Sequence, residues 1–486
     1  MFKEYNEELK KKKWQDLKKS VATSIHSDSP MSIEDILLNV KNIRFDSLIS
    51  QLDVKTEEDK QEYAKHGYFA AITENELKEK FPKVDPSCIF YTPSISNGAI
   101  YFNPQTLAVC PFHIELYIGG LSKDLDGFYR TIEKREKEVE SKEFFGSALT
   151  LPDAMRLEYF ELLVKTYEGI PDLYHLFFSM YQNSDYGFNS LKTETIQKIL
   201  DSKTEEEHKA TKEQLSIYPD TFTVYRGGSF DVSTPPEQAY SWTTDINIAN
   251  FFATRRGVGP AYIAYATVEK DKVIEASLDS PEQEIIIDPK NVKITDVVTL
   301  KGLEDCKTIL PEIAPTYHKY KEQMETLDFA QKSSLHGKQH EARVLLHCLT
   351  IAYLLDLPPS DIKILATAAI YHDTQRVHDD IDPTHGAASA VYYRENNKNP
   401  DPIVNFLIEY HCLPDTDAYT HIKETRVLSK NRSKTTQLYN IFKDADALDR
   451  LRLPGGIHEL DVDQLREPIS KSLTLLARLY LENVEL

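Results

Sequence analysis

The hydrophobic pattern of the chain changes its period twice, and this change constrains the fold more than any other feature. Residues 153–183 repeat apolar side chains every three or four positions, which is typical of amphipathic helices. After residue 220 the apolar residues gather in short β-branched and aromatic runs separated by turn residues, which indicates strands. From about residue 325 onward the helical period returns. We therefore expect a multidomain α+β protein that ends in an all-α bundle.

The length of 486 residues exceeds what one hydrophobic core usually supports, so two or three domains are expected. The patterns predict an N-terminal accessory or recruitment region of mixed structure, a domain made of a helical lobe and a sheet, a connector, and a helical bundle. The expected bounds of these four parts are residues 1–145, 146–298, 299–324 and 325–486.

The composition excludes several classes of function. The formal net charge of −20 disfavours binding to nucleic-acid backbones, which requires clustered Lys and Arg. The five cysteines are scattered without CxxC spacing, which indicates a reducing compartment. No apolar run has transmembrane length, and the lysine-rich residues 1–20 are predicted to be a charged, solvated helix instead of a secretory signal. We expect a cytoplasmic protein, working in its own cell or delivered into a host or target cell.

Three short motifs follow one another in the region of predicted strands. Arg226 ends a strand in VYRGG, where Gly227 allows close backbone approach, and Ser241 lies in YSWTTD. Glu282 and Glu284 lie two positions apart in PEQEIIID, a spacing that puts both carboxylates on one face of a strand. Each motif alone is more typical of ordinary strand and turn chemistry than of catalysis.

Together and in this order, the three motifs resemble the R-S-E class of ADP-ribosyltransferases over residues 146–298. The resemblance implies that fold, a helical lobe plus a split β-sheet core, with NAD as co-substrate. It implies that Glu284 stabilises the oxocarbenium-like ribose formed when nicotinamide leaves, as in glycoside hydrolysis. It further implies that Ser241 orients Glu284 by a hydrogen bond and that Arg226 binds a ribose or phosphate of NAD.

The Glu-x-Glu form of the last motif accompanies transfer to arginine side chains in that family. Glu282 is therefore expected to position and activate the guanidinium of an acceptor protein. The expected NAD-binding residues also include Gly227, Thr243 and Phe252, with Phe251 as the alternative to Phe252. Asp245 is predicted to cap the helix that carries these two phenylalanines.

The predicted bundle concentrates histidine and aspartate. His336 and His340 have the i, i+4 spacing that lets two imidazoles meet one ligand. The apolar stretch DIKILATAAIYHD predicts a buried helix that ends in His372 and Asp373. A buried ionisable pair is costly unless it is paired or bound to a metal, so we expect a metal there.

These segments resemble the HD-domain phosphohydrolases, whose signature is H…HD…D on a helical bundle. The resemblance assigns the four metal positions to His340, His372, Asp373 and Asp446, with Asp444 as the alternative for the last. The mixed imidazole and carboxylate set suits Mn²⁺, Fe²⁺, Zn²⁺, Ni²⁺ or Mg²⁺, and the metal would activate a water for attack on phosphorus. Five further residues are candidates for phosphate contacts or a second metal: His336, Arg343, Arg376, His385 and His411.

The two resemblances together predict a bifunctional enzyme, a mono-ADP-ribosyltransferase acting on protein arginine joined to a metal-dependent phosphohydrolase or phosphodiesterase. The second site could act on the pyrophosphate of ADP-ribose made by the first. This pairing is similar to the SidE-type bacterial effectors, which attach ubiquitin to serine through phosphoribose, although the domain order here is reversed. The open alternatives are SidE-like modification of ubiquitin or another host protein, independent nucleotide hydrolysis, and a helical bundle that only senses a nucleotide and gates the transferase.

Overall fold

The structure, a computed structural model, describes residues 45–93, 98–114, 124–184, 191–230, 233–255, 260–330, 336–453 and 459–483. The lysine-rich segment at residues 1–20, predicted to be a charged helix, lies outside these ranges. The chain divides into two compact units, Met1–Glu205 and Glu206–Leu486. The mixed α and β composition, with two antiparallel sheets and a helical C-terminal region, is confirmed.

The first unit contains a four-stranded antiparallel sheet. Its strands run in the order β1 (Ile49–Ser50), β2 (Ile89–Tyr91), β3 (Ala99–Phe102) and β4 (Val109–Pro111). Helices α3 (Glu57–Lys65), α4 (Glu74–Lys80) and α6 (Leu125–Glu140) accompany it. Thr56 and Thr73 begin α3 and α4 with capping boxes, in which side chain and backbone satisfy each other's hydrogen bonds.

The predicted helical lobe packs against this same sheet. It consists of α7 (Phe145–Thr150), α8 (Arg156–Thr166), α9 (Leu173–Gln182) and α10 (Thr193–Asp201). Tyr159 and Phe160 of α8 share a core with Ile100 and Phe102 of β3. The helical lobe therefore belongs to the first compact unit, whereas the strands that follow it belong to the second.

The second unit begins with α11 (Glu205–Gln214) and a six-stranded antiparallel sheet in the order β10-β7-β5-β6-β9-β8. The strands are β5 (Thr221–Ser229), β6 (Ser241–Thr243), β7 (Ala261–Glu269), β8 (Val273–Ser277), β9 (Glu284–Ile287) and β10 (Val292–Leu300). The β-branched and aromatic runs predicted as strands form β5, β7, β8 and β9.

Helix α12 (Ile246–Thr254) lies directly against β5. Asp245 caps it, with its Oδ1 accepting the Asn247 N–H at 2.8 Å, as predicted. A Cβ added to Gly227 would lie 1.6 Å from the carbonyl oxygen of Ala249. Gly227 therefore serves the packing of helix on strand, which differs from the expectation that it lets backbone approach NAD.

The segment expected to be a connector forms the 23-residue helix α13 (Leu303–Glu325). Its apolar side chains recur at helical spacing and enter the core of the bundle, among them Ile309, Ile313 and Tyr317. Pro311 and Pro315 lie inside this helix. Because proline usually interrupts helices, a helix was not predicted for this segment from its sequence.

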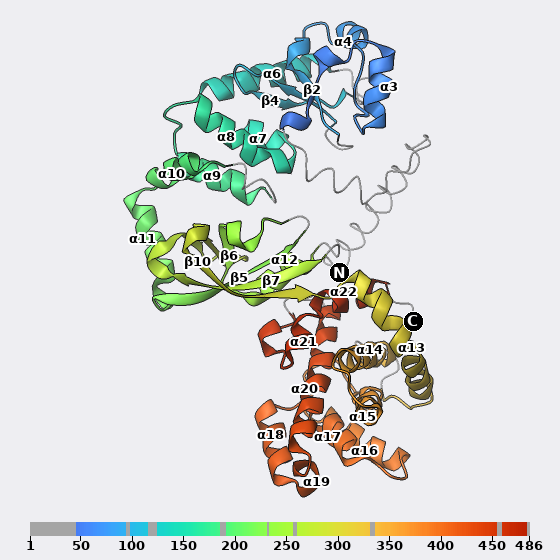
Figure 1. The fold of residues 1–486 in the computed structure, drawn as a ribbon. Helices are drawn as coiled ribbons and strands as arrows, with labels where there is room; N and C mark the ends of the chain where they lie inside the picture. Colours follow the sequence, from blue (N-terminus) through green and yellow to red (C-terminus); the bar gives the residue numbers. More distant parts are fainter. Residues whose placement is uncertain are drawn as a thin grey trace. The chain divides into compact units, whose positions relative to one another are not determined.

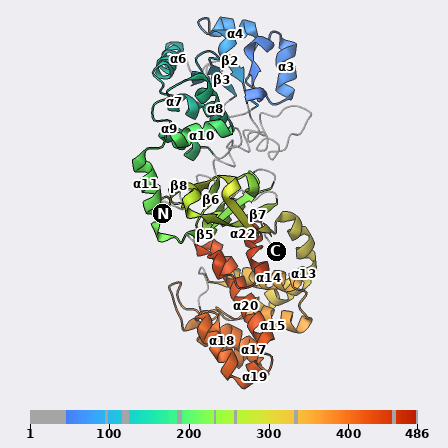
Figure 2. The same cartoon turned by 60° about the vertical axis from the view of Figure 1, so that its left-hand side comes forward.

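The C-terminal bundle contains most of the remaining helices (Figures 1 and 2). Its core is continuous with α13 and includes the buried faces of α14 and α20. The elements are α14 (Lys338–Leu354), α15 (Pro359–Ala369), α16 (His385–Asn396), α17 (Pro402–Tyr410), α18 (Asp415–Glu424), α19 (Arg426–Ser429), α20 (Arg432–Leu448), α21 (Pro468–Lys471) and α22 (Thr474–Asn483).

The sheet and the bundle of the second unit meet through α12 and α22. Arg478 of α22 donates a hydrogen bond to the Thr254 carbonyl at 3.0 Å, and Asn247 Oδ1 accepts the N–H of Val462 at 3.0 Å. Ile246, Ala249 and the residues of the bundle form one apolar core. The two candidate sites described below therefore lie in one compact unit.

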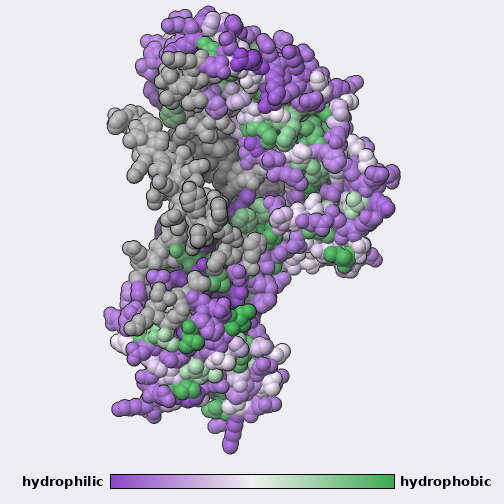
Figure 3. Space-filling view, turned by 180° about the vertical axis from the view of Figure 1, so that it is seen from behind, coloured by the Kyte–Doolittle hydropathy of each residue, from purple (hydrophilic) through white to green (hydrophobic). Residues whose placement is uncertain are grey.

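The bundle surface is mostly hydrophilic on the face seen at the bottom of Figure 3, with small separate hydrophobic patches. None of the helices in the described ranges has the length and hydrophobicity needed to cross a membrane. All five cysteines are free thiols.

Candidate metal centre and candidate transferase site

A cluster of histidine and aspartate lies inside the bundle. His340 comes from α14, His385 begins α16, and His411 follows the last residue of α17. His372 and Asp373 lie in the turn after α15, three and four residues beyond Ala369, the last residue of the buried helix that was predicted to end in them. The side chains of this cluster are almost completely excluded from water, with 3% exposure for Asp373 and 0% for His372.

Each histidine of the cluster has its Nδ1 engaged by an oxygen of the protein. The His372 Nδ1 lies 2.9 Å from the Ala369 carbonyl, and the His411 Nδ1 lies 2.7 Å from the Ile408 carbonyl. The His385 Nδ1 lies 2.5 Å from the Asp382 carbonyl. A carbonyl accepts only, so each Nδ1 carries the hydrogen and each Nε2 presents a lone pair.

The fourth histidine is held by a carboxylate. The His340 Nδ1 lies 2.7 Å from Asp449 Oδ2 at the start of the short 3₁₀ helix Asp449–Arg452. Asp449 is fully buried, and its Oδ1 also accepts the Nε–H of Arg343 at 2.5 Å. This carboxylate–histidine arrangement is the outer-shell contact that fixes the ring of a metal-binding histidine.

The Nε2 atoms that remain point toward one another in pairs. His340 Nε2 lies 3.2 Å from His372 Nε2, and His385 Nε2 lies 2.8 Å from His411 Nε2. Two lone pairs at these distances repel each other. A divalent cation that accepts both lone pairs removes this repulsion, so the donor set fits a metal.

Asp373 lies between the two pairs of histidines. Its Oδ1 is 3.0 Å from His385 Nε2 and 3.3 Å from His411 Nε2. Its Oδ2 is 3.2 Å from His336 Nδ1 and 3.7 Å from His340 Nε2. Within the described part of the chain, the buried Oδ1 has no hydrogen-bond partner, which is the condition of an atom arranged for a cation. Asp373 can therefore bridge two metal ions, one on each oxygen.

Asp446, on α20, and not Asp444 joins the cluster. Asp446 Oδ1 lies 3.3 Å from His340 Nε2. Asp444 instead accepts the backbone N–H groups of Arg466 and Glu467 at 2.9 Å and 2.8 Å. Two residues along a helix turn the side chain to another face, which explains the difference.

The donors form two sets that share Asp373. We call them the inner set (His340, His372, Asp373 and Asp446) and the outer set (Asp373, His385 and His411); His336 lies beside Asp373 Oδ2. His340, His372 and Asp446 have ligand atoms within 4.8 Å of one another, and Asp373 belongs to two further groups of this kind, one with His336 and His340 and one with His372 and His411. The structure thus brings together the four expected metal positions and three of the five further candidates, His336, His385 and His411.

The electrostatics of the cluster suit metal binding. Burial lowers the pKa of His372 to about 3, so this imidazole is neutral near pH 7. Burial opposes the ionisation of Asp373, but the surrounding imidazoles, His372 first, outweigh burial and hold the pKa of Asp373 well below its usual range. A neutral imidazole such as His372 and an ionised carboxylate are the protonation states that ligate a divalent ion, whereas at His340 the hydrogen bonds to Asp446 and Asp449 outweigh burial and raise the pKa.

A cleft of about 510 Å³ opens beside the outer set and is lined by charges of both signs. Its lining includes five cationic residues (Arg376, Lys443, Arg450, Arg452 and Arg466) and five acidic residues (Asp373, Asp382, Asp446, Glu459 and Asp461). Lys443 Nζ donates to the carbonyls of His411 and Leu413 at 2.6 Å and 3.2 Å. The arginine side chains of this wall can donate to the oxygens of a phosphate, although the acidic residues of the lining balance their charge.

The two arginines expected to clamp phosphate differ in their surroundings. Arg376 lines the cleft, with its Nε donating to the His378 carbonyl at 3.0 Å. Arg343 donates from Nε and Nη2 to Asp449 instead, which makes it a partner of the carboxylate behind His340. The burial of Asp449 explains the difference, because a buried carboxylate needs cationic neighbours.

Sequence reasoning missed several residues around the cluster. Asp449 and Arg452 follow Asp446 at three and six positions, a helical spacing that signals a shared face. Glu341 was also missed; its Oε1 accepts the Asp373 N–H at 3.1 Å and so holds the turn. Burial and the charge of Asp373 raise the pKa of Glu341 well above its usual range.

The side chains of Arg226, Ser241 and Glu284, one from each of the three sequence motifs, lie next to one another in the sheet of the second unit. Ser241 Oγ donates to Glu284 Oε1 at 2.5 Å, and Arg226 Nη1 donates to the Ser241 carbonyl at 2.7 Å. These contacts follow from the order of neighbouring strands β5, β6 and β9, which pairs Thr243 with Glu284. Arg226 Nε is buried and has no hydrogen-bond partner in the described residues.

The other expected transferase residues lie nearby in sequence but have varied roles. Thr243 Oγ1 donates to the Glu282 carbonyl at 2.7 Å, which ties the two motifs together. Phe252 lies on α12, with the Arg255 guanidinium 4.6 Å from the centre of its ring. Glu282 lies in a turn before β9, and Gln283 has φ of +44°. The argument that strand alternation puts Glu282 and Glu284 on one face is therefore wrong.

Comparison with known proteins identified no relative. No family model matches the chain, and neither a curated protein nor a solved structure matches it.

Proposed function

We propose that the bundle is a metal-dependent phosphohydrolase of the HD type with two adjacent metal positions. One observation carries the proposal: Asp373 presents its two carboxylate oxygens to two different groups of histidines. Two-metal sites of this kind serve phosphoester and phosphoanhydride cleavage. The arginines that line the cleft beside the outer set support a phosphate-bearing substrate.

Each residue of the site has a task within this proposal. The inner and outer sets would hold divalent ions, which when bound would supply a metal-activated water and polarise a phosphoryl oxygen. Asp449 fixes His340, and the backbone carbonyls behind His372, His385 and His411 fix the other rings. Arg376 and Arg452 in the cleft wall neutralise the charge of the phosphate.

Hydrolysis assays with the full-length chain test this proposal. Chelator-treated protein is given bis(p-nitrophenyl) phosphate or ADP-ribose, with Mn²⁺, Fe²⁺, Zn²⁺, Ni²⁺ or Mg²⁺ restored one at a time. We expect metal-dependent turnover that His372→Ala abolishes. The matched control is His318→Ala, an exposed histidine on α13. No turnover with any metal, together with tight nucleotide binding, would instead support the nucleotide-sensing alternative.

We further propose that the sheet of the second unit transfers ADP-ribose from NAD to arginine side chains of a protein. The chain of contacts from Arg226 through Ser241 to Glu284 favours this function, since it resembles the R-S-E arrangement. Ser241 orients the Glu284 carboxylate, which would stabilise the cationic ribose. The buried Nε of Arg226, which has no hydrogen-bond partner among the described residues, is suited to a ribose or phosphate oxygen of NAD.

Mass spectrometry can test whether the two activities act in series. Lysate proteins are incubated with NAD and either the wild type or His372→Ala, and modified arginines are mapped. Action in series predicts intact ADP-ribose with His372→Ala and a shorter phosphoribosyl remnant with the wild type. If the shorter remnant is found on ubiquitin joined to serine, the SidE-like alternative gains support; if both proteins leave intact ADP-ribose, the bundle has an independent substrate.

A further inference from the structure

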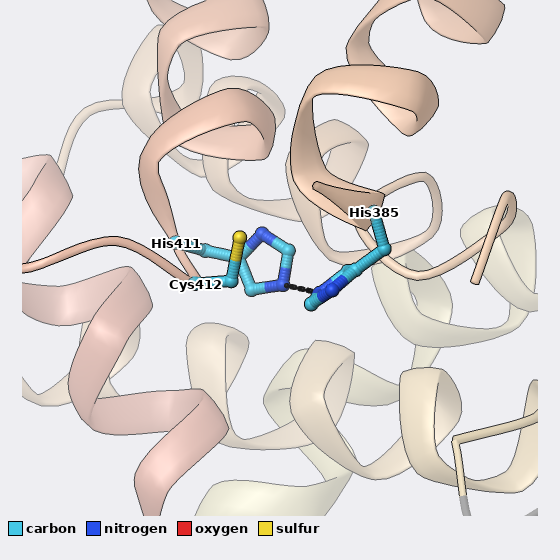
Figure 4. A group of neighbouring side chains, drawn as sticks. All are labelled: His385, His411 and Cys412. Atoms are coloured by element: carbon cyan, nitrogen blue, oxygen red, sulfur yellow. Dashed lines mark hydrogen bonds between the residues drawn. The ribbon is translucent and has the colours of Figure 1, made fainter. Parts of the chain in front are cut away.

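Cys412 lies beside two histidines of the outer set. It follows His411 directly, and its Sγ lies within 4.8 Å of the ligand nitrogens of His385 and His411. Figure 4 shows the two imidazoles pointing toward one another, with the thiol next to the His411 ring. Cys412 also lines the cleft. Three donor atoms of metal-binding type thus converge at the mouth of the site.

Close packing of α16 on the end of α17 produces this arrangement. A Cβ added to Gly386 would lie 2.8 Å from the Glu409 carbonyl oxygen and 3.0 Å from Cys412 Sγ. Only glycine leaves room for the first turn of α16, which carries His385, to approach the thiol this closely. The hydrogen bond from Sγ to the Pro383 carbonyl, at 3.5 Å, is a weak one.

We propose that Cys412 is a thiolate ligand of the outer metal, together with His385 and His411. The inference rests on the proposed metal centre. Asp373 Oδ1 supplies independent support, since it is buried, lacks a hydrogen-bond partner among the described residues and lies 3.0 Å from His385 Nε2. On binding, the metal–sulfur bond forms and the thiol proton leaves to solvent.

This ligand gives the two metal positions different preferences. The inner set offers only imidazole and carboxylate, which accept Mn²⁺, Fe²⁺ or Mg²⁺ as well as Zn²⁺. A thiolate in the outer position selects a softer ion such as Zn²⁺ and disfavours Mg²⁺. The outer position would also be the one that thiol oxidation or alkylation disables.

Cobalt spectroscopy of the chelator-treated, full-length chain tests the proposal. Co²⁺ bound to a thiolate adds a sulfur-to-metal charge-transfer band in the near ultraviolet to its visible d–d bands. We expect this band in the wild type and in Cys306→Ser, a control thiol on α13, and its loss in Cys412→Ser. Visible bands without the near-ultraviolet band in the wild type would overturn the role of Cys412 and leave the metal centre intact. Absence of both kinds of band would overturn the metal centre as well.

A second measurement on the wild type avoids any folding defect of the variant. Iodoacetamide labelling of each cysteine is followed by mass spectrometry, with and without Zn²⁺. Coordination predicts that Zn²⁺ slows labelling of Cys412, whereas labelling of Cys88, in the first unit, is unchanged. Equal labelling of Cys412 with and without Zn²⁺, under conditions where Zn²⁺ binding is verified, would refute the proposal.

Discussion

Asp449→Asn is the substitution that most sharply tests how the protein orients its proposed metal ligands. The side chain is fully buried and touches three groups: His340 Nδ1 at 2.7 Å, Arg343 Nε at 2.5 Å and Arg452 Nη1 at 3.2 Å. Asparagine keeps the shape and one acceptor oxygen. It removes the negative charge and turns an NH₂ group toward groups that themselves donate.

The size of the effect follows from these contacts. Loss of a carboxylate behind a metal-binding histidine typically costs 10–100-fold in metal affinity, or about 1.4–2.8 kcal/mol. Removing the carboxylate that pairs with two buried guanidinium groups also lowers the free energy of unfolding, by on the order of 3 kcal/mol. We therefore expect a folded, less stable protein in which Mn²⁺ binds about 10–100-fold more weakly.

Calorimetric titration of the chelator-treated chain with Mn²⁺ measures the affinity, and urea denaturation measures the stability. Asp361→Asn is the matched control, because Asp361 is also a buried carboxylate of the bundle and pairs with Lys434, away from the cluster. The control should lose stability but not metal affinity. If Asp449→Asn binds Mn²⁺ as tightly as the wild type, Asp449 does not orient His340 for a metal.

Three further predictions address the other parts of the second unit. Glu284→Gln should reduce ADP-ribose transfer from labelled NAD by at least about 100-fold, because it removes the charge that would stabilise the ribosyl cation. The control is Glu269→Gln, an exposed substitution on β7, which should leave transfer unchanged. Lys443→Met should weaken the binding of the outer metal without affecting ADP-ribose transfer, because Lys443 Nζ donates a hydrogen bond to the His411 carbonyl at 2.6 Å and so fixes that residue. Unchanged metal binding would contradict this role. Burial, aided by the charge of Glu284, raises the pKa of Glu275 to about 7, so the folded state holds a proton that the unfolded state releases above its own pKa of 4.5. The free energy of unfolding of the wild type should accordingly fall between pH 4.5 and about pH 7, by about 3 kcal/mol before solvent screening and on the order of 2 kcal/mol after it, and urea denaturation of Glu275→Gln should lack this slope.

Much of the fold could be predicted because the apolar periods are regular. The strands β5, β7, β8 and β9 carry β-branched and aromatic residues between clear turns, and the helical period of α14 is equally plain. Helix α13 was not predicted, because Pro311 and Pro315 interrupt a sequence whose apolar residues otherwise recur at regular helical spacing. The packing of the helical lobe on the first sheet depends on long-range contacts, such as Tyr159 with the Leu107 carbonyl at 2.8 Å, which have no local signal.

Part of the candidate metal centre could be predicted from the sequence, for chemical reasons. A His-Asp pair beside an apolar helix stands out because burial of ionisable groups is costly, and this signal identified His372 and Asp373. The bridging position of Asp373 and the support from Asp449 depend on how four helices meet, which spacing along one helix cannot reveal. Glu282 was placed wrongly because the chain turns at Gln283, with φ of +44°, before β9 begins.

The metal content of the purified, reconstituted chain tests the central claim most directly. Full-length wild type and Asp373→Asn are incubated with excess Zn²⁺, freed of unbound ion, and analysed by elemental mass spectrometry. A shared carboxylate predicts two ions per chain in the wild type and fewer than one in Asp373→Asn, because both positions lose a ligand. Wild-type protein without bound metal, or Asp373→Asn with the same content as the wild type, would contradict a metal centre built around Asp373.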